Sequence, residues 1–499
     1  MLKGKILKAN MLYVPAQILG FMISLAKGLI IPKLLLPEEY GLMVVIFLVI
    51  GYSKIANFGI LNAFDREYPK MISNPNIGED VAHYRNSCFT FFLFNSALFS
   101  VGAIIFFLIN YHHQPMIATG LILVGIGMFL DNINEFIVVV NRAHRNFSLV
   151  SANRLLGNLI SASLLIIITY FFGIRGAIIS VFFANISMLY FYLKAEDKPS
   201  LTMNMALAKP IYRLGASLFA VLFLSMTIDT LDKIMVIKTY GLEPAGVYNL
   251  THSISRIIML LFGSAIYVFY PFVLSEYAKN RDSDKLLSLY EKYALFVFWL
   301  APVFLSGLFV FFHSFIPWYL PAYASAVTFM HFLFLGTFWV IFAQLNDTFL
   351  LVVNKQNVIV RNQLLTIFLA SIFFIWCYSR SLEIPWIAAF YFIYIMFYGV
   401  LSYFSFLRAQ SIRFNSGLYL FVKFLMPFLV LSMMCFIMLT QEKSLFPFIN
   451  NTALKTFLCI LIIAMGSTPF IWLLNKKFLV VKELWAILRL KFGYVVREK

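Results

Sequence analysis

Charged residues are scarce in this chain, and long polar segments are absent. Only 12% of the 499 residues are Asp, Glu, Lys or Arg, against roughly 25% in a typical soluble domain. By contrast, 62% of the residues are hydrophobic and 18% are aromatic. A water-soluble protein of this size could not bury so much apolar surface in its core. The composition therefore excludes an ordinary cytosolic enzyme, a secreted disulfide scaffold and a disordered chain.

Cysteines and catalytic motifs are also missing or sparse. Cys88, Cys377, Cys435 and Cys459 lie far apart within apolar runs, which indicates neither a disulfide framework nor a metal site. The chain contains no G-x-x-x-x-G-K-[ST], H-E-x-x-H, C-x-x-C or G-x-S-x-G motif. We therefore expect no cofactor, no metal and no enzymatic activity. Uphill movement of a solute would need the solute's own gradient or an ion gradient, with H⁺ or Na⁺ as the counter-ion.

Apolar runs of about 20 residues recur along the whole chain, each long enough to cross a bilayer as a helix. The mean hydropathy is +0.86. The sequence thus predicts an all-α, polytopic integral membrane protein with about 14 transmembrane helices. The expected spans are 11–31, 42–62, 88–109, 116–140, 154–172, 174–193, 214–238, 247–273, 290–312, 325–353, 363–379, 385–407, 418–439 and 453–474.

Lysine and arginine are unequally divided between the two sides of these spans. The termini and the connections on their side, counted together with the adjoining span ends such as Arg154, hold 28 of the 39 basic residues, while the opposite connections and span ends hold five. Cytoplasmic loops carry the excess of Lys and Arg, so we expect both termini in the cytoplasm. The net charge of +17 then reflects membrane orientation, and nucleic acid is not an expected partner. All connections are short, which leaves no room for a soluble catalytic domain.

An offset of 205 residues brings two parts of the chain into register. Lys33, Glu38 and Gly41 in KLLLPEEYG meet Lys238, Glu243 and Gly246 in KTYGLEPAG. Farther along, with small insertions or deletions in between, the segment Asn153-Arg154-Leu155-Leu156 resembles Asn362-Gln363-Leu364-Leu365. Parallel repeats of this kind are associated with transport at the interface between the halves.

The repeat predicts four regions. They are an N-terminal lobe over 1–200 with the first six spans, a C-terminal lobe over 201–410 with the next six, two extra helices within 411–474, and a tail over 475–499. The tail is basic and amphipathic, so we expect it to lie along the cytoplasmic leaflet. A short disordered end is the alternative.

Ionisable side chains within predicted spans are costly to bury, so they usually face a cavity or a partner. The set comprises the cations Lys27, Lys54, Lys233 and Arg256 and the carboxylates Asp131, Glu135, Asp229, Asp232 and Asp347. Cations that converge in a cavity would suit an anionic headgroup such as a pyrophosphate. Alternatively, the charges only lock helices together, with the basic residues neutralising Asp131 or Asp232 and with Asp229 paired to Lys233.

Four short segments carry a family pattern. They are Pro37-Glu38-Glu39-Tyr40-Gly41, Asn62-Ala63-Phe64-Asp65-Arg66, Leu231-Asp232-Lys233 and Gly241-Leu242-Glu243-Pro244-Ala245-Gly246-Val247-Tyr248. In this order, over residues 1–410, they resemble the MOP superfamily of polysaccharide exporters, especially Wzx-type O-antigen flippases. The resemblance implies two six-helix lobes around a central cavity.

Such a protein is expected to translocate an undecaprenyl-pyrophosphate-linked oligosaccharide, such as an O-antigen or similar repeat unit, by alternating access. The direction is from the cytoplasmic to the periplasmic leaflet of the bacterial inner membrane, within lipopolysaccharide or related polysaccharide biosynthesis. Coupling to an ion gradient is expected. The implied partners are the lipid-linked glycan, the bilayer and the polysaccharide polymerase or ligase machinery.

The resemblance also assigns roles to residues. Lys27, Lys54 and Arg256, together with Lys233 and Arg66, are expected to bind the pyrophosphate headgroup. Lys replaces Arg at two of these positions and lacks the bidentate fork of arginine. The carboxylates Asp131, Glu135, Asp229, Asp232 and Asp347 are then the candidates for ion coupling or for lining the cavity.

Two other functions are compatible with the sequence. A MATE-like multidrug or organic-cation antiporter belongs to the same superfamily, but it would favour isolated carboxylates over embedded cations. A membrane glycan polymerase or acyltransferase would usually carry a sizeable extracytoplasmic loop, and every predicted outside loop is short.

Overall fold

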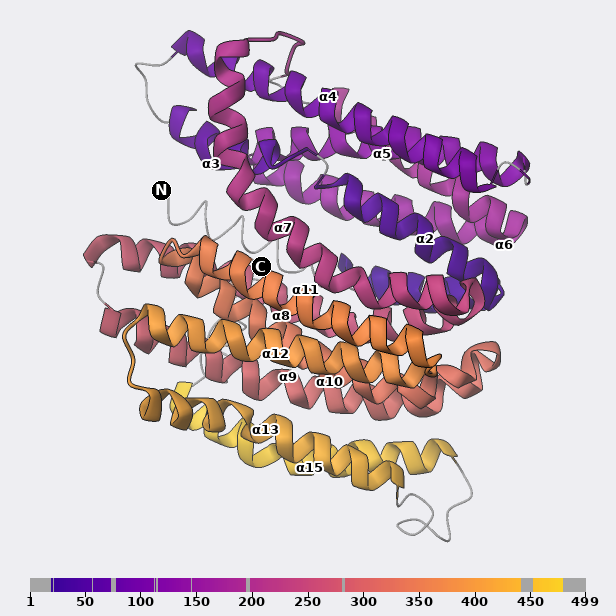
Figure 1. Cartoon of the computed structure of the whole chain (residues 1–499), viewed down its shortest axis with the longest axis vertical. Coiled ribbons are helices and arrows are strands. Elements are labelled where there is room, and N and C mark those ends of the chain that lie inside the picture. The colour runs from indigo at the N-terminus through magenta and orange to yellow at the C-terminus, as the bar shows by residue number, and fades with distance from the viewer. Residues whose placement is uncertain are drawn as a thin grey trace, which may run out of the picture. The chain divides into compact units, whose positions relative to one another are not determined.

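The structure, a computed structural model, describes residues 19–478 except positions 21, 56, 73–77, 112, 114, 145, 194–197, 281–282 and 441–451. Within these residues the chain consists of helices and short connections, so the all-α prediction is confirmed (Figure 1). Apolar sequence favours helices because a helix satisfies its own backbone hydrogen bonds where water is absent. The basic tail lies outside the described residues, apart from its first four positions.

A helical stretch over 22–34 comes first. The helices that follow are α2 (Pro37–Ser53), α3 (Ile60–Ile72), α4 (Gly78–Tyr111), α5 (Pro115–Ala143), α6 (Phe147–Leu193), α7 (Met205–Tyr240), α8 (Leu242–Asn280), α9 (Ser283–Tyr319), the 3-10 helix η2 (Pro321–Ala326), α10 (Val327–Val352), α11 (Gln356–Arg380), α12 (Ile384–Ala409), α13 (Phe414–Thr440) and α15 (Thr452–Phe478).

Among the described residues, nine helical segments are long and apolar enough to cross a membrane. Helix α7 adds a tenth if its two parts, bent by 53°, form one span. The prediction of a polytopic membrane protein is therefore confirmed. The expected count of about 14 helices stays a prediction.

Helix α6 contains a sharp break at Gly173. This residue has φ 59° and ψ −141°, a conformation that glycine adopts because it has no Cβ. A Cβ on Gly176 would lie 2.2 Å from the carbonyl oxygen of Ile168, although eight residues of straight helix span about 12 Å. The chain thus turns back on itself at Gly173, between the expected spans 154–172 and 174–193.

The described helices divide into two compact units. The first contains Met1–Ile257 and Gln356–Phe390, and the second contains Ile258–Lys355 and Tyr391–Lys499. In the first unit, α5 packs against α4 and α6, and α7 packs against α3 and α11. In the second unit, α9 packs against α10, α13 and α15. The division into lobes at residue 200 stays a prediction.

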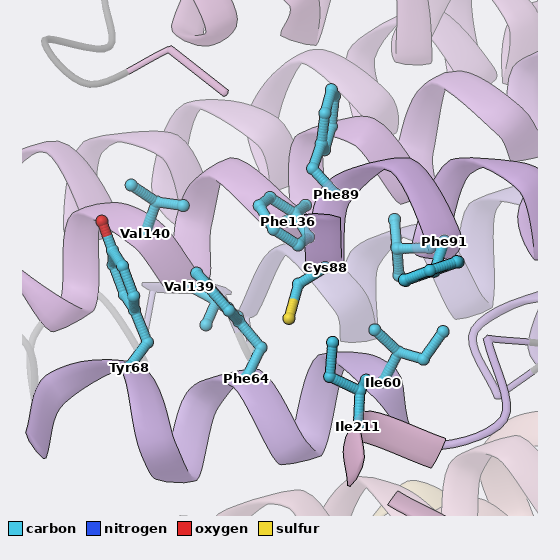
Figure 2. Packing of buried hydrophobic residues seen from close by; sticks show 11 residues of the cluster. Ile60, Phe64, Tyr68, Cys88, Phe89, Phe91, Phe136, Val139, Val140 and Ile211 are labelled. Atoms are coloured by element: carbon cyan, nitrogen blue, oxygen red, sulfur yellow. The ribbon is translucent and has the colours of Figure 1, made fainter. Parts of the chain in front are cut away.

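An aromatic cluster fixes α3 in the first unit. Figure 2 shows Phe64 and Tyr68 of α3 facing Phe136 of α5, with Cys88 of α4 beside them. The ring of Phe64 stacks on those of Tyr68 and Phe136, at centroid distances of 4.4 and 4.7 Å. Cys88 is buried, as are the other three cysteines, and none of the four forms a disulfide. The cluster holds α3 against α4 and α5, directly after the polar turn that ends α2.

The N-termini of α2 and α8 meet through two glycines in the first unit. A Cβ on Gly41 would lie 1.8 Å from the carbonyl oxygen of Leu242, and a Cβ on Gly246 would lie 2.0 Å from that of Pro37. The offset of 205 residues relates Pro37 to Leu242 and Gly41 to Gly246. Each helix therefore offers the other the same surface, as expected for elements related by a two-fold axis.

Replacing Gly41 or Gly246 with alanine should lower the thermal unfolding midpoint of the purified protein. The new methyl group would overlap the facing carbonyl, and overpacking costs about 1–3 kcal/mol. The matched control is Gly102→Ala in α4, where a Cβ meets nothing within 4 Å and where alanine favours the helix. Equal midpoints for the three variants would contradict the close contact.

Candidate functional site

Two interrupted helices cross in the first unit. Helix α2 ends at Ser53, and the chain turns before α3 begins at Ile60, so the expected span 42–62 is not continuous. In this turn, Phe58 and Gly59 have φ values of 51° and 78°. A Cβ on Gly59 would lie 2.3 Å from the carbonyl oxygen of Gly215, close to the bend of α7. Irregular backbone at membrane depth occurs where it is buried in protein or lines a cavity.

Lys54 begins this turn and faces two carboxylates of α5. Its Nζ lies 3.4 Å from Asp131 Oδ2 and 4.0 Å from Glu135 Oε1. The lysine side chain is 50% exposed, whereas Asp131 and Glu135 are 19% and 17% exposed. The sequence left open whether the buried cations neutralise carboxylates or face an anionic ligand. In the structure Lys54 pairs with Asp131, and half of its side chain is nevertheless accessible.

Arg154 of α6 holds the second carboxylate of this group. Its Nη1 and Nη2 donate to the two oxygens of Glu135 at 2.7 and 2.8 Å. One residue earlier on both helices, the side-chain amide of Asn153 donates a hydrogen bond to Asn134 Oδ1 at 2.7 Å. Arg154 lies at the start of the expected span 154–172 and was counted with the basic residues of the cytoplasmic side, so its place in the site was not predicted.

Lys27 supplies a further positive charge beside Lys54. It is half-buried on the first described helix, and its charge lies close enough to interact with that of Lys54. Within the described part of the chain, no carboxylate forms an ion pair with it. The group of Lys27, Lys54, Arg154, Asp131 and Glu135, which we call the α2 turn cluster, carries a net charge of +1.

A second charged group joins α7 to α8. Arg256 donates to both oxygens of Asp229, at 2.7 and 3.1 Å. The alternative pairing of Asp229 with Lys233 is therefore wrong. In the described residues, Lys233 itself has no carboxylate within ion-pair distance. The hydroxyls of Tyr52 and Thr230, hydrogen-bonded at 2.8 Å, link α2 near Lys54 to α7 beside Asp229.

Asp232 lies deeper in the same unit and is fully buried. Its Oδ2 accepts a hydrogen bond from the Tyr248 hydroxyl at 2.8 Å and lies 3.5 Å from His252 Nε2. Its Oδ1 has no hydrogen-bond partner among the residues that the structure describes. Neither Lys nor Arg pairs with Asp232 there, in contrast to Asp131, Glu135 and Asp229.

Asp347 belongs to the second unit. Its carboxylate accepts hydrogen bonds from the hydroxyls of Tyr398 and Ser402, which lie one turn apart on α12. The Ser402 bond measures 2.7 Å. No described Lys or Arg forms an ion pair with it. Asp347 was a predicted site residue, but its two hydroxyl donors were not predicted.

Arg66 lies on the exposed side of α3. Its Nε is 3.7 Å from Glu67 Oε1 on the same helix. The structure therefore brings Lys27 and Lys54 together with Asp131 and Glu135, and it gathers the α7 and α8 charges in one region. It places Arg66 in a local pair and Asp347 in the other unit. Their roles in binding and coupling stay predictions.

A sequence family described as "Polysaccharide biosynthesis protein" matches residues 30–323. An inward-facing multidrug resistance MATE family transporter of the MOP superfamily is similar in structure, with a TM-score of 0.63 and 14% identity, covering 79% of this chain and 94% of its own. The lipid II flippase MurJ, in an inward closed conformation, is also similar in structure, with a TM-score of 0.65 and 15% identity. The match covers 94% of this chain and 100% of the MurJ chain. No match was found among curated proteins.

These similarities confirm the fold that the sequence motifs predicted. Both structural relatives are named for transport or flipping across a membrane and not for an enzymatic reaction. At such low sequence identity they establish the shared fold.

The Asp229–Arg256 pair should contribute measurably to stability. In a double-mutant cycle with Asp229→Asn and Arg256→Gln, we expect a coupling energy of about 1–2 kcal/mol, because the pair is bidentate and its side chains are only 28% and 21% exposed. The matched cycle at Asp65 and Arg142, which are 40% and 35% exposed, should give about 0.5 kcal/mol. Equal coupling in denaturant unfolding would contradict this ranking.

Proposed function

Because the chain belongs to the polysaccharide biosynthesis protein family, we propose that it flips a lipid-linked oligosaccharide across the membrane. The proposed cargo is an undecaprenyl-pyrophosphate-linked repeat unit, such as an O-antigen unit. It moves from the cytoplasmic to the periplasmic leaflet of a bacterial inner membrane by alternating access. Both termini are cytoplasmic in this proposal, in keeping with the distribution of Lys and Arg.

The positive α2 turn cluster is the observation that carries this proposal. Flipping leaves every covalent bond intact, so it needs a binding site and not a catalytic one. A pyrophosphate requires positive charge and hydrogen-bond donors in a partly dry site. Lys27 has no ion-pair partner among the described residues, and the neighbouring Lys54 is half-exposed. The two ammonium groups supply both the positive charge and the hydrogen-bond donors. Arg256, Lys233 and Arg66 complete the proposed set of headgroup ligands.

The carboxylates differ in their suitability for ion coupling. Asp131, Glu135 and Asp229 have their charges balanced by Lys or Arg. Asp232 and Asp347 are instead held mainly by hydroxyl groups. A carboxylate of the second kind is better placed to bind and release a cation during transport. We propose these two as the coupling sites for H⁺ or Na⁺.

A drug-cation antiporter would share this fold, yet the net positive charge of the α2 turn cluster favours an anionic cargo. Delivery of the flipped glycan to polymerase or ligase machinery is part of the proposed role in polysaccharide biosynthesis. The cargo class can be measured directly, because a flippase moves an anionic lipid-linked glycan whereas a drug antiporter moves a cationic dye.

Removing either lysine of the α2 turn cluster should impair flipping. In proteoliposomes that contain an undecaprenyl-pyrophosphate-linked glycan, Lys27→Ala and Lys54→Ala should lower the initial rate about tenfold or more, since hydrogen bonds to charged groups contribute about 1.5–3 kcal/mol. Lys27→Arg should retain activity because arginine also binds phosphate. The rate is read as glycan that becomes accessible to an external glycosidase.

Lys423→Ala is the matched control, because this half-buried lysine lies beside Tyr419 on α13, a helix of the second unit. It should flip at the rate of the unaltered protein. Full activity of both cluster variants would refute the headgroup assignment. Efflux of a cationic dye without glycan flipping would refute the proposed cargo.

Neutralising Asp347 should separate transport from the ion gradient. With Asp347→Asn, flipping in proteoliposomes should no longer respond to an imposed pH or Na⁺ gradient, since the group that exchanges the cation is gone. Asp131→Asn should keep its response, because that carboxylate is paired with Lys54. A gradient response in the Asp347 variant that equals that of the unaltered protein would rule this site out.

A further inference from the structure

Glu135 lies between two cations that compete for it. Both of its oxygens accept hydrogen bonds from Arg154, at 2.7 and 2.8 Å. Its Oε1 is 4.0 Å from Lys54 Nζ, at the outer limit of an ion pair. A bidentate guanidinium–carboxylate pair is stronger and more directional than a single ammonium contact. Arg154 therefore binds Glu135 more closely than Lys54 does.

The second repeat has no charge at the corresponding position. The alignment of Asn153-Arg154 with Asn362-Gln363 places Gln363 opposite Arg154. Gln363 donates a neutral hydrogen bond to Ser225 Oγ at 2.7 Å, and α11 still packs against α7. Packing of this helix thus does not by itself require a cation, which indicates that the charge of Arg154 has a local purpose.

That purpose follows from the charge balance around Lys54. The charged groups that act on Lys54 are Asp131 and Glu135 of α5, Arg154 of α6 and Lys27. Without Arg154, the charges of the two carboxylates would cancel those of the two lysines, and the net charge of the group would fall from +1 to zero. Lys54 would then be within ion-pair distance of two carboxylates, Asp131 at 3.4 Å and Glu135 at 4.0 Å, without Arg154 to engage the second one.

We propose that Arg154 is a positioning residue that engages Glu135 and so keeps Lys54 available to an anionic headgroup. The inference rests on the proposed function, and it assigns Arg154 a role without contact to the cargo. Arg154 affects the affinity for the headgroup only through Glu135 and Lys54. Removing the charge of Glu135 should therefore compensate for removing the charge of Arg154.

The decisive variants are Arg154→Gln, which copies the second repeat, and the same change combined with Glu135→Gln. The probe is undecaprenyl pyrophosphate titrated into purified protein in nanodiscs. Arg154→Gln should weaken binding about tenfold, in line with the loss of one charge-assisted interaction. The double variant should restore affinity to near that of the unaltered protein. Thermal unfolding midpoints check that each variant is folded.

A second measurement reports on Lys54 without any lipid. Acylation of Lys54 by an amine reagent, quantified by peptide mass spectrometry, should slow several-fold in Arg154→Gln and recover in the double variant. Lys423, on α13, serves as the internal reference. Unchanged labelling in Arg154→Gln would overturn the inference.

Weak binding that persists in the double variant would also overturn it, since Arg154 would then contact the headgroup or serve only the fold. Failure of the unaltered protein to bind the lipid would refute the proposed function. In that case the labelling of Lys54 in the single and double variants would still decide whether Arg154 sets the environment of the lysine.

Discussion

An ionisable side chain in a membrane-spanning segment is costly unless it has a partner of opposite charge or faces a cavity, because hydrocarbon does not solvate it. In the first unit three contacts balance such charges: Lys54 with Asp131, Arg154 with Glu135, and Arg256 with Asp229. Lys27 adds one positive charge to the first two. A surplus of a single charge, held next to paired groups, suits reversible binding of an anion better than a cluster of bare cations would.

The backbone around these charges is shaped by glycine. Gly59 and Gly215 let the turn after α2 approach the bend in α7, and Gly41 and Gly246 let the first turns of α2 and α8 pack closely against each other. Both approaches are shorter than any side chain would permit. The polar turn that carries Lys54 is thus fixed by backbone packing on one side and by the aromatic core of α3, α4 and α5 on the other (Figure 2).

The helices were predictable because apolar runs and their polar ends are local properties of the sequence. The partners of the charges were not, since Arg256 selects Asp229 only once α7 and α8 pack together. Arg154 was missed because counting basic residues assigns it to a connection. Its signal was the equal spacing between Asn134 and Asn153 and between Glu135 and Arg154. The break after Ser53 was hidden by apolar residues on both sides.

Photocrosslinking tests most directly whether the α2 turn cluster is the headgroup site. An undecaprenyl pyrophosphate analogue with a diazirine beside its pyrophosphate would be irradiated with the protein in nanodiscs, and the attachment points mapped by mass spectrometry. The account predicts crosslinks on the helix over 22–34 and on the turn over 54–59, with loss of label in the presence of excess undecaprenyl pyrophosphate. Crosslinks confined to α9, α10, α13 or α15, or insensitive to that competitor, would contradict it.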